Sequence, residues 1–221
     1  SKIIKGEKGG AALKKIKFIV VFVACVFLCL PAANAAMLGV ELLNPDILSN
    51  QTGFYAYTWD SNDQEGLFTA RALPLTISAD GSTLTNIGDD RSYEVSFYTD
   101  GAGNFLRGIG GDDLVIVGDS QVLLTGEVTN FGWDKIANTK LALFDFTFKV
   151  TGGTLAPDFA SGLGGDIALA ENSDFAGDWQ VNHEGIKVKH DTAPVVPIPA
   201  TAWLLGAGLI GLVGLRRRFK K

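Results

Sequence analysis

Hydrophobic and polar residues alternate in short runs through the middle of this 221-residue chain. In residues 144–150, three Phe and one Val recur at every second position, with Asp145, Thr147 and Lys149 between them. Residues 93–97 show the same alternation. A period of two places the apolar side chains on one face of a β-strand and the polar ones on the other. Both runs therefore predict strands with one buried face.

Six more segments have strand-like patterns: 54–59, 73–78, 82–87, 113–117, 121–129 and 185–190. Turn-forming pairs such as Asp80-Gly81 and Gly152-Gly153 separate the strand-like segments. Residues 157–163 are expected to form one helical turn, and no convincing amphipathic helix is seen. Short strands with one apolar face each predict an all-β domain, built as an antiparallel β-sandwich or a jelly roll.

The N-terminal part of the chain follows a different pattern. Three lysines precede the apolar residues 18–30, and the small residues Ala33 and Ala35 follow. A basic segment, a short apolar core and an Ala-x-Ala sequence together form a secretory signal peptide. We expect a leader with a signal helix over residues 1–35, cut by signal peptidase after Ala35.

Both cysteines of the chain, Cys25 and Cys29, lie in this leader. An uncleaved N-terminal anchor and a lipoprotein signal built on one of these cysteines are the alternatives. The residues around the cysteines match a lipoprotein signal poorly, and the apolar run is short for an anchor. Once the leader is removed, the exported domain has no cysteine and forms no disulfide. A domain of about 160 residues can bury a sufficient core without one.

A second apolar run, residues 200–215, contains four glycines and no charged side chain. As a helix it would be roughly 24 Å long, slightly less than a hydrocarbon core of about 30 Å. Residues 216–221 contain five basic side chains, and such a cluster marks the cytoplasmic end of a membrane span. The sequence predicts a domain over 36–191, a proline-rich linker over 192–199, a transmembrane helix over 200–215 and a basic cytoplasmic tail over 216–221.

This tail resembles the PEP-CTERM sorting signal, the substrate tag of exosortases in bacteria that make exopolysaccharide. The residues that carry the resemblance are Pro197, Pro199, Trp203, Arg216, Arg217 and Arg218. The family's namesake motif has Glu between the two prolines, whereas this chain has Ile198, as in a Val-Pro-aliphatic-Pro variant. The resemblance implies that an exosortase cuts near the two prolines and releases the product or transfers it to an acceptor. A permanent single-span anchor is the alternative.

Removing both signals changes the charge of the protein. The whole chain has a formal net charge of −5, but residues 36–196 hold 23 acidic side chains against eight Lys and Arg, which gives about −15. Such a charge repels nucleic acid and anionic surfaces, and it favours solubility or cation binding. Nucleic acid is therefore excluded as a partner.

Acidic turns offer the weak metal candidates of the domain. The turn residues with oxygen ligands are Asp60, Asn62, Asp63 and Glu65. They lack the spacing of an EF-hand loop, so Ca²⁺ is the one cofactor considered and otherwise none is expected. Two further acidic pairs, at 89–90 and 112–113, could share an ion. Alternatively, Asp simply occupies these positions because it favours turns.

The two histidines, His183 and His190, fit no zinc motif, and we interpret them as surface residues. A Ser/His/Asp hydrolase is arithmetically allowed, but no Gly-x-Ser-x-Gly elbow supports it. We therefore expect no enzymatic activity. Five aromatic residues either form a sugar-stacking surface or pack in the core: Tyr55, Tyr57, Trp59, Trp133 and Trp179.

Taken together, these features predict an exported, non-catalytic bacterial protein of the cell surface or exopolysaccharide matrix. Its partners would be the Sec translocon, signal peptidase, an exosortase and the inner membrane that holds the precursor, with exopolysaccharide as a further partner. A secreted carbohydrate- or calcium-binding module is the alternative, and a secreted hydrolase is the third reading.

Overall fold

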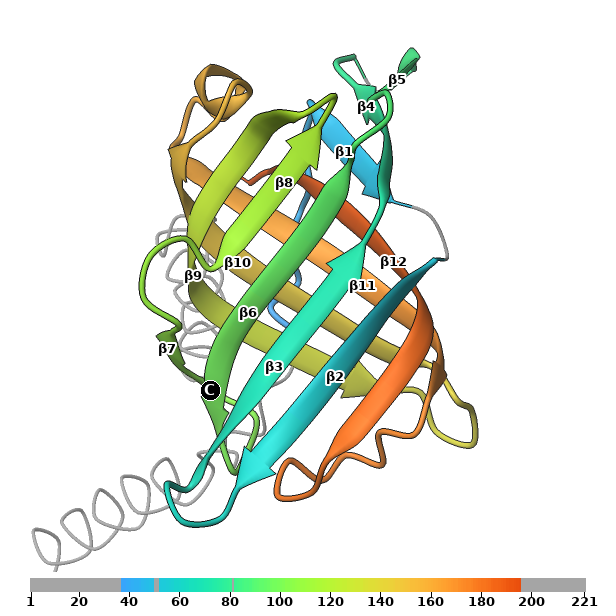
Figure 1. The fold of residues 1–221 in the computed structure, drawn as a ribbon. Helices are drawn as coiled ribbons and strands as arrows, with labels where there is room; N and C mark the ends of the chain where they lie inside the picture. Colours follow the sequence, from blue (N-terminus) through green and yellow to red (C-terminus); the bar gives the residue numbers. More distant parts are fainter. Residues whose placement is uncertain (1–36, 50–51, 81, 196–221) are drawn as a thin grey trace, which may run out of the picture. The chain divides into compact units, whose positions relative to one another are not determined.

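The computed structural model describes residues 37–49, 52–80 and 82–195, which fold into twelve β-strands and one short 3₁₀ helix (Figure 1). The elements are β1 (Asp46–Ser49), β2 (Gly53–Asp60), β3 (Glu65–Ala72), β4 (Pro74–Ser78), β5 (Leu84–Asn86), β6 (Ser92–Asp100), β7 (Phe105–Gly108), β8 (Leu114–Gly118), β9 (Gln121–Lys135), β10 (Ala142–Gly152), η1 (Ala156–Asp158), β11 (Leu163–Ser173) and β12 (His183–Pro194). Within these ranges no helix is long and apolar enough to cross a membrane. The expected signal helix and transmembrane helix lie outside the described residues.

Eight of the strands form a closed antiparallel barrel. They are hydrogen-bonded in the order β11-β10-β9-β8-β6-β3-β2-β12, and β12 also pairs with β11. Because the first and last strands pair with each other, one sheet closes on itself. The predicted antiparallel all-β class is confirmed. The predicted sandwich or jelly roll is not, since β11–β12 pairing joins what would be two separate sheet edges.

The remaining strands extend this barrel. Strand β1 pairs with β12 and with β4, and β5 adds to β4 (Figure 1). Strands β7 and β8 both pair with β6, each with a different part of that strand. The expected helical turn appears as η1, slightly earlier in the chain than predicted.

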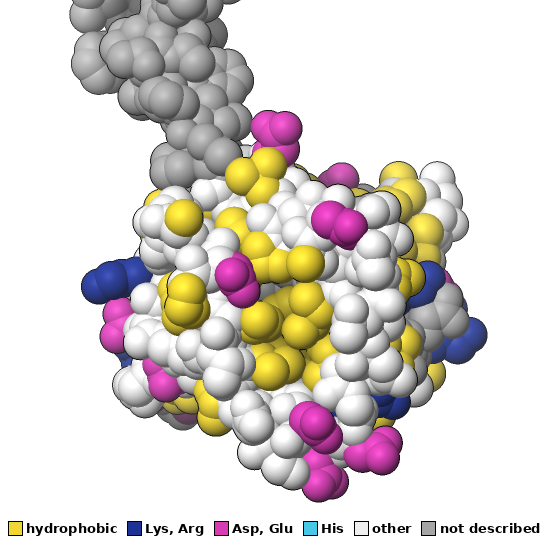
Figure 2. All heavy atoms as spheres, turned by 90° about the horizontal axis from the view of Figure 1, so that it is seen from above, with side chains coloured by type: hydrophobic (Ala, Val, Ile, Leu, Met, Phe, Trp, Pro, Cys, Tyr) yellow, Lys and Arg dark blue, Asp and Glu magenta, His cyan; other side chains and the backbone are white. Residues whose placement is uncertain are grey.

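The upper end of the barrel in Figure 1 presents hydrophobic side chains. Figure 2, which looks onto this end, shows them gathered in the middle of the face with acidic side chains around them. Three of the exposed hydrophobic residues are Leu73, between β3 and β4, Leu84 of β5 and Val122 of β9. In Figure 1, strand β12 finishes at this upper end.

The barrel interior is filled by side chains that alternate along the strands. Phe144, Phe146 and Phe148 of β10 all point inward and are at most 1% exposed. An eight-stranded barrel is just wide enough for its own side chains to fill it. Phe68 stacks on Phe97 with ring centroids 5.1 Å apart, and similar contacts continue through the core. The alternation read from the sequence thus becomes an aromatic core.

Glycine is required where an aromatic ring approaches the wall of the barrel. A Cβ at Gly164 of β11 would lie 2.1 Å from Cζ of Phe148, and one at Gly66 of β3 would lie 2.0 Å from the hydroxyl oxygen of Tyr57. Real Cβ contacts are never so short, so the two rings occupy space that only glycine leaves free.

The last strand reaches further than the sequence predicted. Thr192, Ala193 and Pro194 were expected in the proline-rich linker, but they belong to β12, and the first two are fully buried. Beyond them, Val195 forms a β-bridge with Leu42. The chain therefore stays attached to the barrel up to the residue before Val196.

Candidate functional site

The two histidines lie inside the barrel and not on its surface, as the sequence had suggested. His183 is 4% exposed and His190 is 2% exposed. In β12, Val188, His190 and Thr192 alternate with charged residues and all face the interior. A strand with period two places its inward residues together, whether they are apolar or not. The surface interpretation was therefore wrong.

His190 takes part in a buried polar network centred on Asp166 of β11. The Nδ1 atom of His190 lies 3.0 Å from Oδ1 of Asp166. The other carboxylate oxygen accepts hydrogen bonds from the hydroxyls of Thr192, at 2.5 Å, and Tyr93, at 3.0 Å. All four residues are buried. Their hydrogen bonds tie β6, β11 and β12 together within the core.

The hydroxyl of Tyr93 keeps its proton within this network. Burial and the neighbouring Asp166 carboxylate raise the pKa of Tyr93 well above its usual range, so that its hydroxyl remains a donor. A histidine paired with a carboxylate acts in catalysis when its other nitrogen faces a nucleophile. In the part of the chain that the structure describes, Nε2 of His190 has no hydrogen-bond partner. This arrangement is a set of hydrogen bonds centred on Asp166 within the core.

His183 lies in a cage of aromatic rings at the other end of β12. Its ring stacks on Tyr57 with centroids 4.6 Å apart and contacts Phe175 and Trp179 at 4.6 and 5.0 Å. Neither ring nitrogen has a hydrogen-bond partner among the described residues. Burial lowers the pKa of His183 to about 4, because the cage disfavours the charged imidazolium. His183 is consequently neutral at physiological pH.

The aromatic residues proposed to stack on sugars are mostly core residues. Tyr55, Tyr57 and Trp179 are at most 2% exposed. Trp59 and Trp133 are partly buried and pack against the same core. Tyr55, Tyr57 and Trp179 therefore provide packing and are not available to stack on a sugar, while Trp59 and Trp133 keep part of their surface exposed.

The acidic turn suggested for Ca²⁺ connects β2 to β3. Asp60 and Glu65 face each other across the hairpin. The carboxylate of Asp60 accepts the backbone N–H of Asn62 at 2.8 Å, and Glu65 lies 2.5 Å from the guanidinium of Arg107. Asp63 is exposed. Among residues 37–49, 52–80 and 82–195 no group of three or more His, Cys, Asp or Glu side chains is arranged to hold a metal. Calcium binding here stays a prediction.

Asp113, from another acidic pair, supports the barrel wall. It is 4% exposed and sits where β7 ends and β8 begins. Its two carboxylate oxygens accept the backbone N–H groups of Ile109, at 2.8 Å, and Val128, at 2.9 Å. The carboxylate thus replaces ladder hydrogen bonds that the break between the strands removes. This Asp acts as a turn residue.

A pair of carboxyl groups links β1 to β12 on the outer side of the sheet. Burial, and then the hydrogen bond and charge of Asp46, raise the pKa of Asp191 to about 8. Two carboxylates so close together cannot both ionise easily, so the pair retains a proton near neutral pH.

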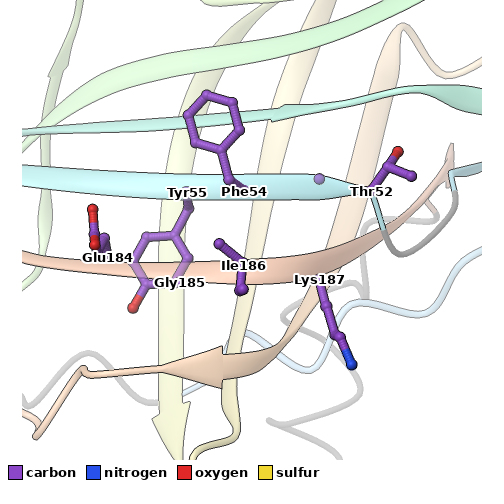
Figure 3. Close-up of a pocket in the computed structure, with 8 residues that line it drawn as sticks. Thr52, Phe54, Tyr55, Glu184, Gly185, Ile186 and Lys187 are labelled. Carbon is purple, nitrogen blue, oxygen red and sulfur yellow. The ribbon is translucent and has the colours of Figure 1, made fainter.

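The outer face of β2 and β12 carries a shallow groove of about 480 Å³. Figure 3 shows Phe54 and Tyr55 pointing to opposite sides of β2, so that Tyr55 enters the core and Phe54 lines the outside. Phe54 pairs in register with Ile186, and their exposed fractions are 41% and 54%. Glu184 and Lys187 add charges to the same groove. Sequence patterns do not indicate this groove, because its residues come from two strands far apart in the chain.

The residues of the two expected processing signals lie outside the described ranges: Ala33, Ala35, Pro197, Pro199, Trp203, Arg216, Arg217 and Arg218. The comparisons with known proteins add no assignment to them. No family model, no curated protein and no solved structure matches this chain.

Proposed function

We propose that this chain is the precursor of an exported, non-catalytic protein of the bacterial cell surface or extracellular matrix. In this proposal the barrel is the delivered domain, and the two terminal segments are the signals that deliver it. The observation that carries the proposal is the position of the barrel's two ends relative to those signals.

The folded domain fits between the two expected cleavage sites. On the N-terminal side, the backbone of Leu38, three residues after Ala35, is already hydrogen-bonded to the barrel. On the C-terminal side, Val195 is bridged to Leu42, and Leu43 donates to the carbonyl of Pro194 at 2.9 Å. Cutting after Ala35 and near Pro197–Pro199 would therefore release the barrel with short tails and without loss of a strand.

The delivery route follows from the sequence signals. The Sec translocon and signal peptidase would export the chain and remove the leader. The C-terminal span would hold the precursor in the inner membrane until an exosortase acts on the proline motif. The net charge of about −15 over 36–196 suits a soluble product outside the cell. The exopolysaccharide matrix is the proposed destination.

Two features of the barrel support a non-catalytic role. Its interior is occupied by aromatic side chains where a ligand-binding barrel would hold its substrate. The buried pair of His190 and Asp166 is closed by Tyr93 and Thr192 and has no nucleophile against Nε2 in the described part of the chain. Turnover of glycoside or ester substrates that is lost on changing His190 would contradict this role.

Intact mass spectrometry of the protein isolated from its producing cells tests the proposal. We expect a species that begins at Ala36 and ends near Pro197–Pro199. Replacing Pro197 and Pro199 with Ala should leave the tail in place, whereas Pro157→Ala, at an exposed position in η1, should not affect processing. A mature protein that retains Trp203 through Lys221 would refute exosortase cleavage.

The outer groove favours a second candidate function, carbohydrate binding. Phe54 and Ile186 give an exposed apolar platform, and Glu184 and Lys187 add hydrogen-bonding groups at its edge. Sugar rings are bound by this combination of flat apolar contact and polar groups. A polysaccharide that binds the native barrel should raise its Tm.

The groove can be tested with matched variants. Phe54→Ala should abolish a polysaccharide-induced Tm shift, while Leu84→Ala, which truncates an exposed residue on β5, should preserve it. Adding Ca²⁺ or EDTA in the same series tests the Asp60–Glu65 turn. If no polysaccharide and no Ca²⁺ shifts the Tm, both binding alternatives fail.

A further inference from the structure

Glu184 of β12 is shared by three neighbouring hollows on the outer face of the barrel. The first is the groove that contains Phe54 and Ile186. A second hollow, of about 320 Å³, has Asp174 and Lys140 in its lining. A third, of about 280 Å³, again contains Asp174. Because they share lining residues, the three hollows are parts of one depression around the beginning of β12.

The register of the strands arranges the outer side chains of this depression in two rows. Ile186 is paired with Phe54 of β2. Two residues earlier, Glu184 is paired with Ala56, and the backbone N–H of Glu184 donates to the carboxylate of Asp174 at 2.6 Å. Positions two residues apart on a strand are separated by about 7 Å. An apolar row and a row of carboxylates therefore lie side by side.

The third hollow combines two carboxylates with uncharged neighbours. Glu184 and Asp174 are both exposed, and in the described part of the chain neither of them belongs to an ion pair. The other residues that line this hollow are Ala56, Tyr57, Thr58, Asn182 and His183. His183 is neutral at physiological pH, so the hollow carries negative charge only. It is suited to a positively charged group.

The lysines of the depression line its other two parts. Lys140 belongs to the second hollow and Lys187 to the first. Figure 3 shows the Lys187 side chain extending away from Phe54 and Glu184. The net charge of about −15 over residues 36–196 adds a long-range attraction for cations. A cationic ligand is therefore favoured at the third hollow over an anionic one.

A buried histidine supplies a further acceptor at this hollow. His183 lines it and is 4% exposed, and neither of its ring nitrogens has a hydrogen-bond partner among the described residues. A neutral imidazole has one nitrogen that donates and one that accepts. An ammonium group has three donors and no acceptor, so its hydrogen-bonding needs match two carboxylates and one such nitrogen.

We propose that this depression binds a polysaccharide whose sugars carry free amino groups. One sugar ring lies on the row of Phe54 and Ile186. Its ammonium group lies in the third hollow and donates to Glu184, Asp174 and His183. The inference rests on the carbohydrate-binding candidate described above, because it uses the same apolar platform, and it adds the charge of the sugar.

The apolar row favours an amino sugar over a lysine-rich peptide. Phe54 and Ile186 are 41% and 54% exposed and form a platform on which a sugar ring can pack. The neighbouring row of carboxylates is about one sugar ring away, so a single residue of the polysaccharide contacts both rows. A lysine side chain carries the same charge on a flexible stem and has no ring to occupy the platform.

The test is isothermal titration calorimetry of the mature protein, isolated from its producing cells, at pH 5.5. At this pH the amino groups of glucosamine are protonated, and His183, whose pKa is about 4, is neutral. A glucosamine oligomer should bind at least about tenfold more tightly than the same oligomer after N-acetylation. Acetylation removes the charge and the ammonium donors while it keeps the sugar ring.

Two variants with the same net charge separate the hollow from long-range attraction. Glu184→Gln should weaken binding of the glucosamine oligomer about fivefold, because it removes one charge contact at an exposed site. Glu127→Gln, which removes an exposed carboxylate on β9, should change the affinity little. Equal weakening by both variants would overturn the inference, since the attraction would then come from net charge alone.

The other outcomes are equally decisive. Equal affinity for the free and the acetylated oligomer would overturn the inference and leave carbohydrate binding at the groove standing. A lysine oligomer that binds as tightly as the glucosamine oligomer would replace the sugar with a basic peptide. If neither sugar oligomer binds while another polysaccharide gives a Tm shift that Phe54→Ala abolishes, the inference fails and the carbohydrate-binding candidate survives.

Discussion

Buried polar side chains in this barrel are accommodated in two different ways. Asp166 receives three hydrogen-bond partners, Tyr93, His190 and Thr192, and can remain in the core as a satisfied acceptor. His183 has none among the described residues and is accommodated by staying neutral between aromatic rings. Burial of Asp166 depends on the positions of its hydrogen-bond partners. Burial of His183 depends on a pH at which its ring is neutral.

We predict that His183 makes the barrel less stable in acid. Its pKa is about 4 in the folded protein, against an ordinary 6.5, so between these values the unfolded chain takes up a proton that the folded protein excludes. The free energy of unfolding should fall by about 3 kcal/mol as the pH drops from 6.5 to 4. His183→Phe should reduce this fall in urea denaturation at pH 6.5 and 4.5. Equal losses in both proteins would contradict the prediction.

We predict that the free energy of unfolding depends on the number of hydrogen-bond acceptor atoms at position 113. Asp113→Ala removes both acceptors and leaves the N–H groups of Ile109 and Val128 unpaired, at a cost of about 2–4 kcal/mol in the free energy of unfolding. Asp113→Asn keeps one acceptor and should cost less. Urea denaturation of the two variants checks the order. Asp112→Asn, at the exposed neighbour, is the control and should change little.

Sequence patterns predicted which side chains point into the core better than they predicted which polar side chains bind one another. The alternation of Phe144, Phe146 and Phe148 predicted their burial correctly. Applied to Val188, His190 and Thr192, the same rule would have placed His190 in the core. The partner that satisfies it, Asp166, lies on another strand, and nothing local to either residue indicates that they meet.

At the scale of the strands, sequence patterns did not predict β11 and β3. Both strands contain a glycine that lies next to an aromatic ring. Strand β11 begins with Leu163-Gly164-Gly165-Asp166, which has the composition of a turn, and continues with residues of low β-propensity. Strand β3 contains Gly66 for a related reason. In each strand the glycine makes room for a ring of another strand, Phe148 or Tyr57. Local propensity cannot report such a contact.

We predict that adding a methyl group to β11 destabilises the barrel. Gly164→Ala should lower the free energy of unfolding by about 1–3 kcal/mol, because the new Cβ overlaps the ring of Phe148. The cost should be smaller when Phe148 is replaced with Leu, as a double-mutant cycle would show. Gly152→Ala meets only the Thr125 hydroxyl, at 3.2 Å, and serves as the control. An unchanged cost in the Phe148→Leu background would exclude the overlap as the cause.

At the scale of the whole molecule, closure of the barrel was beyond sequence reasoning. A sandwich and a barrel use the same antiparallel strands with the same alternating faces. The choice depends on whether β11 and β12 pair. In this protein they do, from the pair of Gly164 with Pro194 to the pair of Ser173 with Gly185. The sequence established the class of fold, and the long-range pairing determines the architecture.

The whole barrel should also lose stability in mild alkali. The pKa of Asp191 is raised to about 8, so the folded protein keeps a proton that the unfolded chain has released above pH 4. Stability is therefore lost as the pH rises toward 8, and above pH 6.5 this loss is not offset by His183. Melting at pH 6.5 and 8.5 should show a lower Tm at the higher pH. Asp191→Asn, which is neutral throughout, should flatten the difference, and a wild-type Tm that is equal at both pH values would refute the assignment.

The buried end of β12 has a mechanical consequence. Thr192–Pro194 pairs with β11 on one side. On the other side, Thr192 pairs with β1, and Pro194 and Val195 are bonded to Leu43 and Leu42, which precede β1. A pull on the chain beyond Val195 acts along β12, and the hydrogen bonds of a sheet lie across its strands. The load is then shared in shear by the whole ladder, and the bonds are not opened one at a time. A barrel pulled from this end should therefore resist tension along β12.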